Sequence, residues 1–155
     1  MKIFFDTEFI EDGKTIELLS IGMVRDDGAS YYAESSEAHY GNASDWVREN
    51  VLPHLGHLPP KDPAVIRREI VSFVGDAPEF WGYYADYDWV VLCQLFGRMV
   101  DLPKTWPMFC LDIKQLAWQC GNPKLPKPAG GLEHHALRDA AWNRESWKYL
   151  MENFV

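Results

Sequence analysis

Apolar side chains near the start of the chain occur in short runs that are rich in aromatic and β-branched residues. Runs of this kind, bounded by turn residues, are typical of strands. We predict strands over residues 2–6, 17–25 and 30–34, with a turn at Gly28 before the last of them. Because consecutive strands joined by short turns usually pair with each other, these segments are expected to form an antiparallel meander.

The rest of the chain alternates between helical periodicity and short apolar runs. In several segments apolar positions recur every three to four residues, as they do on one face of a helix. The predicted helices cover residues 44–51, 63–75, 87–99, 112–119 and 136–152, and a further strand covers 79–84. Strands followed by alternating helices and strands predict an α/β fold, in which helices flank a mixed central sheet.

Length and composition narrow the classes of protein that fit this pattern. With 155 residues, 47% of them apolar, the chain is expected to form one domain over 1–155. No apolar run approaches the roughly 18 residues of a membrane-spanning helix, so no membrane partner is expected. Three cysteines without a CxxC pair indicate buried thiols of a reducing compartment, which predicts a cytoplasmic protein.

The net charge of −8 bears on which ligands the chain can bind. Proteins that grip long duplex DNA through its phosphates are normally basic, so a large nucleic-acid footprint is disfavoured. A small footprint stays open, because bound divalent cations would place positive charge where a phosphate must lie.

Asp6 and Glu8 interrupt the first apolar strand. Side chains two apart on a strand point to the same side. Two carboxylates about 6 Å apart repel by roughly 3 kcal/mol at an effective dielectric near 20, and a divalent cation would offset that repulsion. The alternative is that the strand ends at Asp6 and leaves Glu8 in solvent.

Asp88 belongs to a second acidic motif and lies in the first turn of the helix predicted over 87–99. The apolar residues that follow Asp88 at helical spacing are Leu92, Leu95, Phe96 and Met99. Asp88 is therefore expected on the core-facing stripe of this helix, whereas Asp86 lies off it. Aspartate is also a common helix N-cap, so a capping role stays open for Asp88 beside a functional one.

His134 and Asp139 form the third motif, at the start of the last predicted helix. A histidine titrates near neutrality and can take a proton from water, so His134 is the candidate general base. The small residues that would let this helix approach the sheet are Ala136, Ala140 and Ala141. The residues expected to face the core are Leu137, Ala140, Ala141, Trp147, Leu150 and Met151. The alternative is a surface histidine beside a solvated Asp139, and His135 is assigned no role.

These acids and the histidine, in this order, resemble the DEDD exonucleases, in the branch with a histidine before the final aspartate. The stretches 6–9 (DTEF) and 134–140 (HHALRDA) match the first and third motifs. The second motif departs, because 83–88 read YYADYD where the family usually has H-N-x-x-F-D. That departure argues against the proofreading and ribonuclease T branches. Two longer stretches are similar to the mycobacterial exoribonuclease AS group, which prefers polyadenylate. They are residues 6–22 (DTEFIEDGKTIELLSIG) and 87–97 (YDWVVLCQLFG).

The resemblance implies a ribonuclease H-like fold and 3′-5′ exoribonuclease activity on single-stranded RNA, including 3′ poly(A) tails. It implies release of nucleoside 5′-monophosphates and a requirement for two Mg²⁺ ions, for which Mn²⁺ can substitute. By the same resemblance, Asp6, Glu8 and Asp139 would hold one ion, Asp6 and Asp88 the second, and His134 would act as base. A homodimer is compatible with the exposed apolar residues expected of the chain.

Phe9 and Trp106 are the candidates for stacking on a substrate base, each with a core position as the alternative. Glu8 and its neighbours are expected near the ribose 2′-hydroxyl. Three other functions stay open: a DNA 3′-5′ exonuclease of the same superfamily, a metal-dependent phosphohydrolase acting on nucleotides, and a non-catalytic RNA-binding module.

Overall fold

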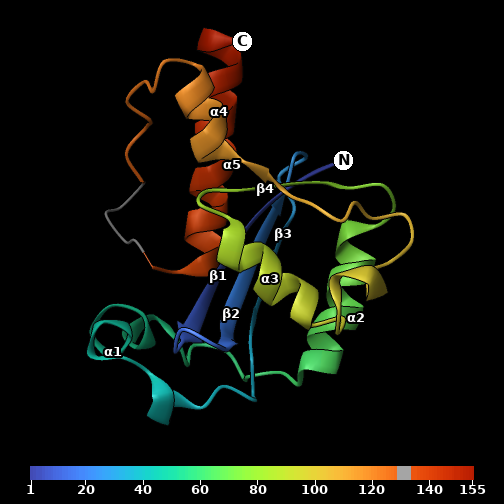
Figure 1. Cartoon of the computed structure of the whole chain (residues 1–155), viewed down its shortest axis with the longest axis vertical. Coiled ribbons are helices and arrows are strands. Elements are labelled where there is room, and N and C mark those ends of the chain that lie inside the picture. The colour runs from blue at the N-terminus through green and yellow to red at the C-terminus, as the bar shows by residue number, and fades with distance from the viewer. Residues whose placement is uncertain (129–133) are drawn as a thin grey trace.

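The computed structural model describes residues 1–128 and 134–155. Within them lies a five-stranded sheet in the order β3-β2-β1-β4-β5 (Figure 1). The strands are β1 (Lys2–Glu11), β2 (Ile16–Arg25), β3 (Ser30–Glu34), β4 (Glu79–Gly82) and β5 (Leu111–Asp112). The helices are α1 (Asp45–Asn50), α2 (Pro63–Val74), α3 (Asp86–Gln94), α4 (Ile113–Gln119) and α5 (Ala136–Phe154).

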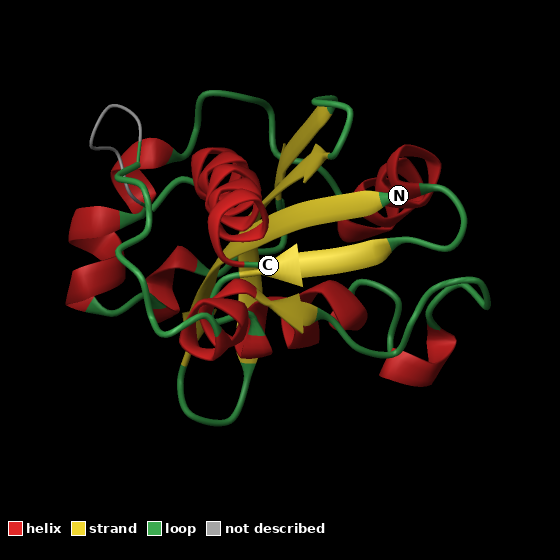
Figure 2. Cartoon of the chain, turned by 90° about the horizontal axis from the view of Figure 1, so that it is seen from above, coloured by secondary structure: helices red, strands yellow, loops and turns green. Residues whose placement is uncertain are grey.

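The sheet is mixed, as the pattern of elements predicted. β1 pairs with β2 and β2 with β3 in antiparallel fashion, which confirms the predicted meander. β4 pairs parallel to β1, and β5 parallel to β4. Helices lie on both sides of the strands, and Figure 2 shows the sheet between them.

Alternation along β1 separates two cores. Ile3 and Phe5 belong to a cluster formed with α2 and α3, whereas Phe4 packs with α4 and α5. Since side chains alternate between the two faces of a strand, Asp6 and Glu8 share the α5 face with Phe4. The two acids of β1 therefore point toward the helix that carries Asp139.

β1 loses its neighbour on one side after Phe4, because β4 pairs only with its first residues. Backbone groups left without a strand partner must find others when they are buried. The side chain of Asn143 donates to the carbonyl oxygen of Phe5 at 2.9 Å, and Asp88 accepts the amide of Thr7 at 2.8 Å. Side chains from α5 and α3 thus complete the edge of β1 where the acids lie.

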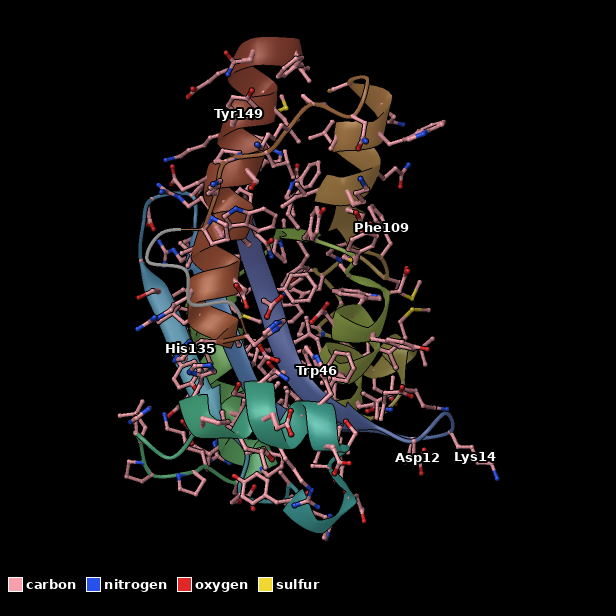
Figure 3. The ribbon with its side chains drawn as sticks, turned by 90° about the vertical axis from the view of Figure 1, so that its left-hand side faces the viewer. Asp12, Lys14, Trp46, Phe109, His135 and Tyr149 are labelled. Carbon is pink, nitrogen blue, oxygen red and sulfur yellow. The ribbon has the colours of Figure 1, made fainter. Side chains whose placement is uncertain are left out.

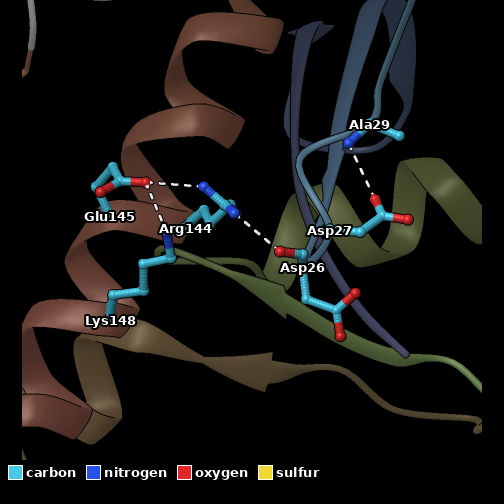
Figure 4. Close-up of polar contacts among 6 residues, drawn as sticks. All are labelled: Asp26, Asp27, Ala29, Arg144, Glu145 and Lys148. Carbon is cyan, nitrogen blue, oxygen red and sulfur yellow. Dashed lines mark hydrogen bonds and ion pairs between the residues drawn. The ribbon is translucent and has the colours of Figure 1, made fainter.

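The start of α5 lies directly against β2. Gly22 has no side chain, and a Cβ there would clash with backbone atoms of Ala136 and Leu137. Ala136 and Ala140 are fully buried at this contact, so the predicted close approach of the helix is confirmed for these two residues. Further along α5, Arg144 donates to the carbonyl oxygen of Asp26 at 2.8 Å and so holds the helix to the β2–β3 turn (Figure 4).

Three expectations about these elements are wrong. β1 does not end at residue 6 but continues to Glu11. The helix predicted over 87–99 ends at Gln94, because the chain tightens into i→i−3 hydrogen bonds and turns at Gly97, with φ of 110°; Met99 is consequently exposed. On α5, Ala141 and Met151 face solvent.

The buried stripe of α5 is partly polar, which is why apolarity alone misplaced it. Its buried residues are Ala136, Ala140, Asn143, Ser146 and Leu150. Among the helices of the described residues, none is both long and apolar enough to cross a membrane.

Candidate active site

Three carboxylates from distant parts of the chain meet at the end of β1. Asp6 and Glu8 of β1 and Asp139 of α5 each offer an oxygen atom, and these atoms lie within 4.8 Å of one another. Glu8 is buried, and Asp6 and Asp139 are half-buried. The alternative in which Glu8 extends into solvent beyond a strand end is therefore excluded.

Asp139 is held in place by the backbone around the start of α5. One of its carboxylate oxygens accepts the amide of His134 at 2.9 Å and that of His135 at 3.2 Å. These amides precede the first turn of α5, where amides lack partners within the helix. Asp139 therefore fixes the chain that carries His134 while its carboxylate stays beside β1.

His134 adopts a left-handed backbone conformation, with φ of 67°, which few residues other than glycine adopt without surrounding constraint. Its ring meets the indole of Trp46 edge to face, with centroids 4.7 Å apart. Figure 3 shows Trp46 and the neighbouring His135 near the junction of α1 and α5. The position of His134, the candidate base, is thus fixed by the two hydrogen bonds to Asp139 and by the contact with Trp46.

Asp88 reaches the site from α3, on the other side of β1 from α5. It is only 7% exposed, and one carboxylate oxygen accepts both the amide and the hydroxyl of Thr7, at 2.8 and 2.6 Å. The N-cap of α3 is Ala85, without a side-chain cap bond, so the capping alternative for Asp88 is wrong. Asp86 is exposed, as expected. Asp88 is thereby anchored to β1 next to the three clustered acids.

The pKa values of these acids are raised mainly by burial, and those of Asp6 and Glu8 also by neighbouring carboxylates. Burial raises the pKa of the Asp6 carboxyl well above its usual range, and neighbouring carboxylates, Asp88 first, raise it further. Burial and then Asp139 raise the pKa of Glu8 to about 8. Burial raises the pKa of Asp88 to about 6, although the hydrogen bonds from Thr7 work against that rise. Negative charge here is costly unless a cation accompanies it.

A cleft of about 480 Å³ opens over the acids. That volume lies within the usual range for sites that bind small ligands. Its lining residues are Asp6, Thr7, Glu8, Phe9, Ile10, Glu11, Ser44, Trp46, Val47, Val51, Asp88, His134 and Asp139. No lysine or arginine is among these described residues, so the negative charge is removed by protonation, as the raised pKa values indicate, or offset by a bound cation.

The donor set fits a divalent metal ion. Carboxylate oxygens are the ligands that Mg²⁺ and Mn²⁺ prefer. In the octahedral shell of one Mg²⁺, each ligand lies about 2.1 Å from the ion, so adjacent ligands are about 3 Å apart and opposite ligands about 4 Å apart. The clustered oxygens of Asp6, Glu8 and Asp139, which lie within 4.8 Å of one another, need only small movements to reach those spacings.

Of the two predicted stacking residues, only Phe9 lines the cleft. Its ring contacts that of Tyr87, with centroids 5.8 Å apart. Trp106 is only 6% exposed, packs on Phe80 and donates its indole N–H to the carbonyl oxygen of Gly75. The prediction that Trp106 stacks on a base is wrong, because its face and its donor are both occupied in the core.

Trp46 is a site residue that the sequence did not single out. It is 53% exposed and lies on α1, a helix of six residues. The weak signal was a large aromatic residue beside Val47, which together with Val51 packs in a small core cluster and also lines the cleft. Only the position of α1 beside His134 shows that Trp46 borders the cleft.

Solved structures share this fold at low sequence identity. A structure of exonuclease I aligns with a TM-score of 0.67 and 16% identity over 99% of this chain. A complex of Escherichia coli exonuclease I with a 5cy-dA13 oligonucleotide gives 0.70 and 14% over 99%. The yeast NOT1 MIF4G–CAF1 co-crystal structure gives 0.58 and 11%, over 97% of this chain and 79% of the other.

This chain spans only about two fifths of exonuclease I, 41% in the first structure and 40% in the complex. At such identities the likeness establishes the fold alone, and it confirms the predicted ribonuclease H-like class.

Closer sequence relatives define the family. Two proteins named 3′-5′ exoribonuclease, from two strains of Mycobacterium tuberculosis, are each 44% identical to this chain over 149 residues. The alignment covers 90% of this chain and 87% of each relative. The family described as the 3′-5′ exoribonuclease Rv2179c-like domain matches residues 1–151. The chain therefore belongs to the family of 3′-5′ exoribonuclease Rv2179c-like domains.

Proposed function

We propose that this protein removes nucleotides one at a time from the 3′ end of single-stranded RNA, releasing nucleoside 5′-monophosphates with the help of two Mg²⁺ ions. The observation that carries the proposal is the meeting of Asp6, Glu8 and Asp139 in one cleft, without a lysine or arginine among its described lining. The family and the names of the M. tuberculosis relatives support RNA as substrate.

Four acids would hold the metal ions. Asp6, Glu8 and Asp139 would ligate one, and Asp6 together with Asp88 the other. The ions would supply positive charge that favours ionisation of the attacking water and offsets the charge developing on the leaving 3′-oxygen.

His134 would accept the proton of the attacking water. A general base must lie within reach of that proton, and His134 lines the same cleft as the acids. Replacing His134 by alanine is expected to slow hydrolysis by roughly 10²- to 10⁴-fold while leaving metal affinity unchanged, which calorimetric titration with Mn²⁺ measures.

The terminal base would lie between Phe9 and Trp46, which border the cleft on β1 and α1. Two aromatic faces suit a large purine, because stacking contributes about 1–3 kcal/mol per base. This arrangement supports polyadenylate as one substrate. The oligonucleotide complexes of exonuclease I support a single strand in this fold.

We also propose a homodimer and a cytoplasmic location. Large apolar side chains on the surface, such as Val71 and Val100, support the homodimer, and three free cysteines support the cytoplasmic location. Light scattering on the purified protein tests the dimer.

The test is digestion of 5′-labelled RNA with a 3′ adenylate tail in Mg²⁺, with and without EDTA. We expect a ladder of products shortened from the 3′ end, release of AMP, and loss of activity in EDTA. Asp6→Ala should abolish the ladder, whereas Asp76→Asn, an exposed acid outside the cleft, should not. Release of inorganic phosphate would favour a phosphohydrolase, and faster digestion of matched DNA would favour a DNA exonuclease.

A further inference from the structure

Two aromatic rings at the start of α3 extend into solvent beside the cleft. Tyr84 is 63% exposed and Tyr87 is 53% exposed. The ring of Tyr87 contacts Phe9, which lines the cleft, and the ring of Tyr84 contacts Tyr83 at a centroid distance of 4.8 Å. Large aromatic residues are normally placed where they bury area, so two exposed rings next to a site point to a ligand.

The backbone holds Tyr84 in this outward position. Its φ is 54°, a left-handed conformation that is costly for a tyrosine and persists only where the surroundings impose it. A Cβ at Gly82 would meet that of Ala85 at 2.6 Å, so the turn is closed too tightly for a larger residue. The amide of Ala85 also donates to Asp112 at 2.9 Å. A strained turn that leaves an aromatic ring exposed is typical of a functional segment.

The neighbouring segment extends this surface. Phe109 is 61% exposed, and the thiol of the next residue, Cys110, lies 3.9 Å from the carbonyl oxygen of Ala85. In Figure 3, Phe109 lies on the same side of the molecule as α3. Exposed rings therefore continue from the cleft along one edge.

The geometry of phosphoryl transfer indicates on which side of the cleft the RNA strand leaves. In an in-line displacement the attacking water and the leaving oxygen lie on opposite sides of the phosphorus. His134, the proposed base, belongs to the α5 side of β1, whereas Asp88 approaches from α3 and bonds to Thr7. With the water at His134, the leaving 3′-oxygen and the strand attached to it lie over Asp88, next to Tyr87.

We propose that the RNA strand 5′ of the scissile bond leaves the cleft over the start of α3, with its first base on Tyr87 and the next on Tyr84. This inference rests on the proposed function and names the residues that hold the retained strand. The exposed Asp86 between the two tyrosines would repel phosphates, so the strand is held through its bases. Stacking of this kind tolerates any sequence and suits the net charge of −8.

A second exit exists on the α5 side. A cavity of about 350 Å³ next to His134 is lined by Tyr83 and Trp142, and a neighbouring one by Trp142, Lys127 and Arg138. A strand leaving there would be held by its phosphates, and its binding would fall steeply with salt. In-line geometry favours the α3 exit. The two exits differ in the variants expected to weaken RNA binding and in the salt dependence of that binding.

The experiment compares hydrolysis of twelve-nucleotide polyadenylate with inhibition by AMP, which occupies the terminal-nucleotide position alone. Tyr84→Ala and Tyr87→Ala are each expected to raise the KM for the RNA by roughly 5- to 150-fold, the range that loss of one stacked base gives. The inhibition constant of AMP should stay within about twofold of the wild-type value. Tyr87→Phe should restore the KM, and Trp118→Ala, an exposed aromatic on α4, should not change it.

The outcomes separate this inference from the proposed function. If the wild-type protein releases no AMP from RNA, the proposed function is wrong. If it does, but both alanine variants keep the wild-type KM, or lose AMP affinity to the same extent, the α3 exit is wrong. A raised KM in Lys127→Ala/Arg138→Ala alone, with a steep salt dependence in the wild type, would place the strand on α5 instead.

Discussion

On the α5 side of β1, three carboxylates crowd together, and no lysine or arginine of the described chain lines their cleft. On the α3 side, Asp88 is already bound by the amide and hydroxyl of Thr7. The residue types are the same, but their hydrogen bonding differs. On the first flank Asp139 accepts the amides of His134 and His135, whereas the carboxylates of Asp6 and Glu8 accept no hydrogen bond from the described residues. The hydrogen bonds from Thr7 lower the pKa of Asp88 and so partly offset the effect of burial, whereas no hydrogen bond lowers the pKa of Asp6 or Glu8. The comparison indicates that the α5 flank depends on a bound cation more than the α3 flank does.

The largest expected loss of hydrolysis follows from replacing Asp139 on the α5 flank, and the same replacement of Asp88 on the α3 flank is the comparison. Asp139→Asn keeps an acceptor for the amides of His134 and His135 but removes the charge at the cluster. We expect a loss of hydrolysis of roughly 10³-fold or more, or about 4 kcal/mol of transition-state stabilisation. Asp88→Asn should cost less, on the order of 10- to 100-fold. Single-turnover rates on labelled RNA measure both, and equal losses would contradict the asymmetry of the flanks.

Gly22→Ala tests the packing that brings Asp139 to β1. The added Cβ clashes with the backbone at the start of α5, which must shift away. We expect a loss of stability of about 1–3 kcal/mol together with a large loss of hydrolysis. Gly41→Ala is the matched control, because nothing lies within 4 Å of a Cβ there. Wild-type activity in Gly22→Ala would show that the helix position does not matter.

Thr7→Val tests the hydrogen bonding of Asp88 on the α3 flank. The variant keeps the amide that Asp88 accepts and removes the hydroxyl, leaving one hydrogen bond in place of two. A buried acceptor that loses a partner typically costs about 1–3 kcal/mol, and we expect that loss of stability in chemical denaturation with a smaller loss of activity. Thr7→Ser should behave as wild type. A greater loss in Thr7→Ser than in Thr7→Val would argue against the role of the hydroxyl.

The smallest expected effect is a change with pH in the stability of the metal-free protein. The folded pKa of Glu8 is raised to about 8, so Glu8 binds its proton more tightly when folded. Its stabilising contribution is full below pH values near 4.5 and is lost as the pH rises through about 8. We expect Glu8→Gln to raise the melting temperature in EDTA at pH 8 by a few degrees, at about 2–4 °C per kcal/mol.

Added Mg²⁺ should reverse that order, because only the wild-type carboxylate binds the ion. Glu37→Gln, an exposed acid, is the control for the loss of one charge. A wild-type protein whose stability in EDTA rises between pH 5 and 8 through Glu8 would contradict the assignment.

Much of the acidic site was predictable because its residues conflict with their surroundings. Asp6 and Glu8 break an apolar strand, and Asp88 begins an apolar stripe, so each is visible as an exception to a local pattern. Their convergence could be expected from the order of the three motifs and the resemblance. The close approach of α5 was expected from its alanines, but the equally necessary Gly22 gives no signal within an ordinary strand sequence.

The residues that escaped prediction are those whose role depends on tertiary placement. Trp46 and Trp106 are both aromatic residues near loops, and only the packing shows that the first borders the cleft and the second fills the core. Asn143 was missed because a polar residue in a helix is expected to face solvent. It is buried because β1 leaves the carbonyl of Phe5 without a strand partner.

The most direct measurement is anomalous diffraction from crystals of the protein soaked in Mn²⁺. We expect one strong peak among the carboxylates of Asp6, Glu8 and Asp139, and a second between Asp6 and Asp88 that weakens in Asp88→Asn. Diffraction that shows no peak at the end of β1, or that places the Asp139 carboxylate away from the two acids of that strand, would contradict this expectation.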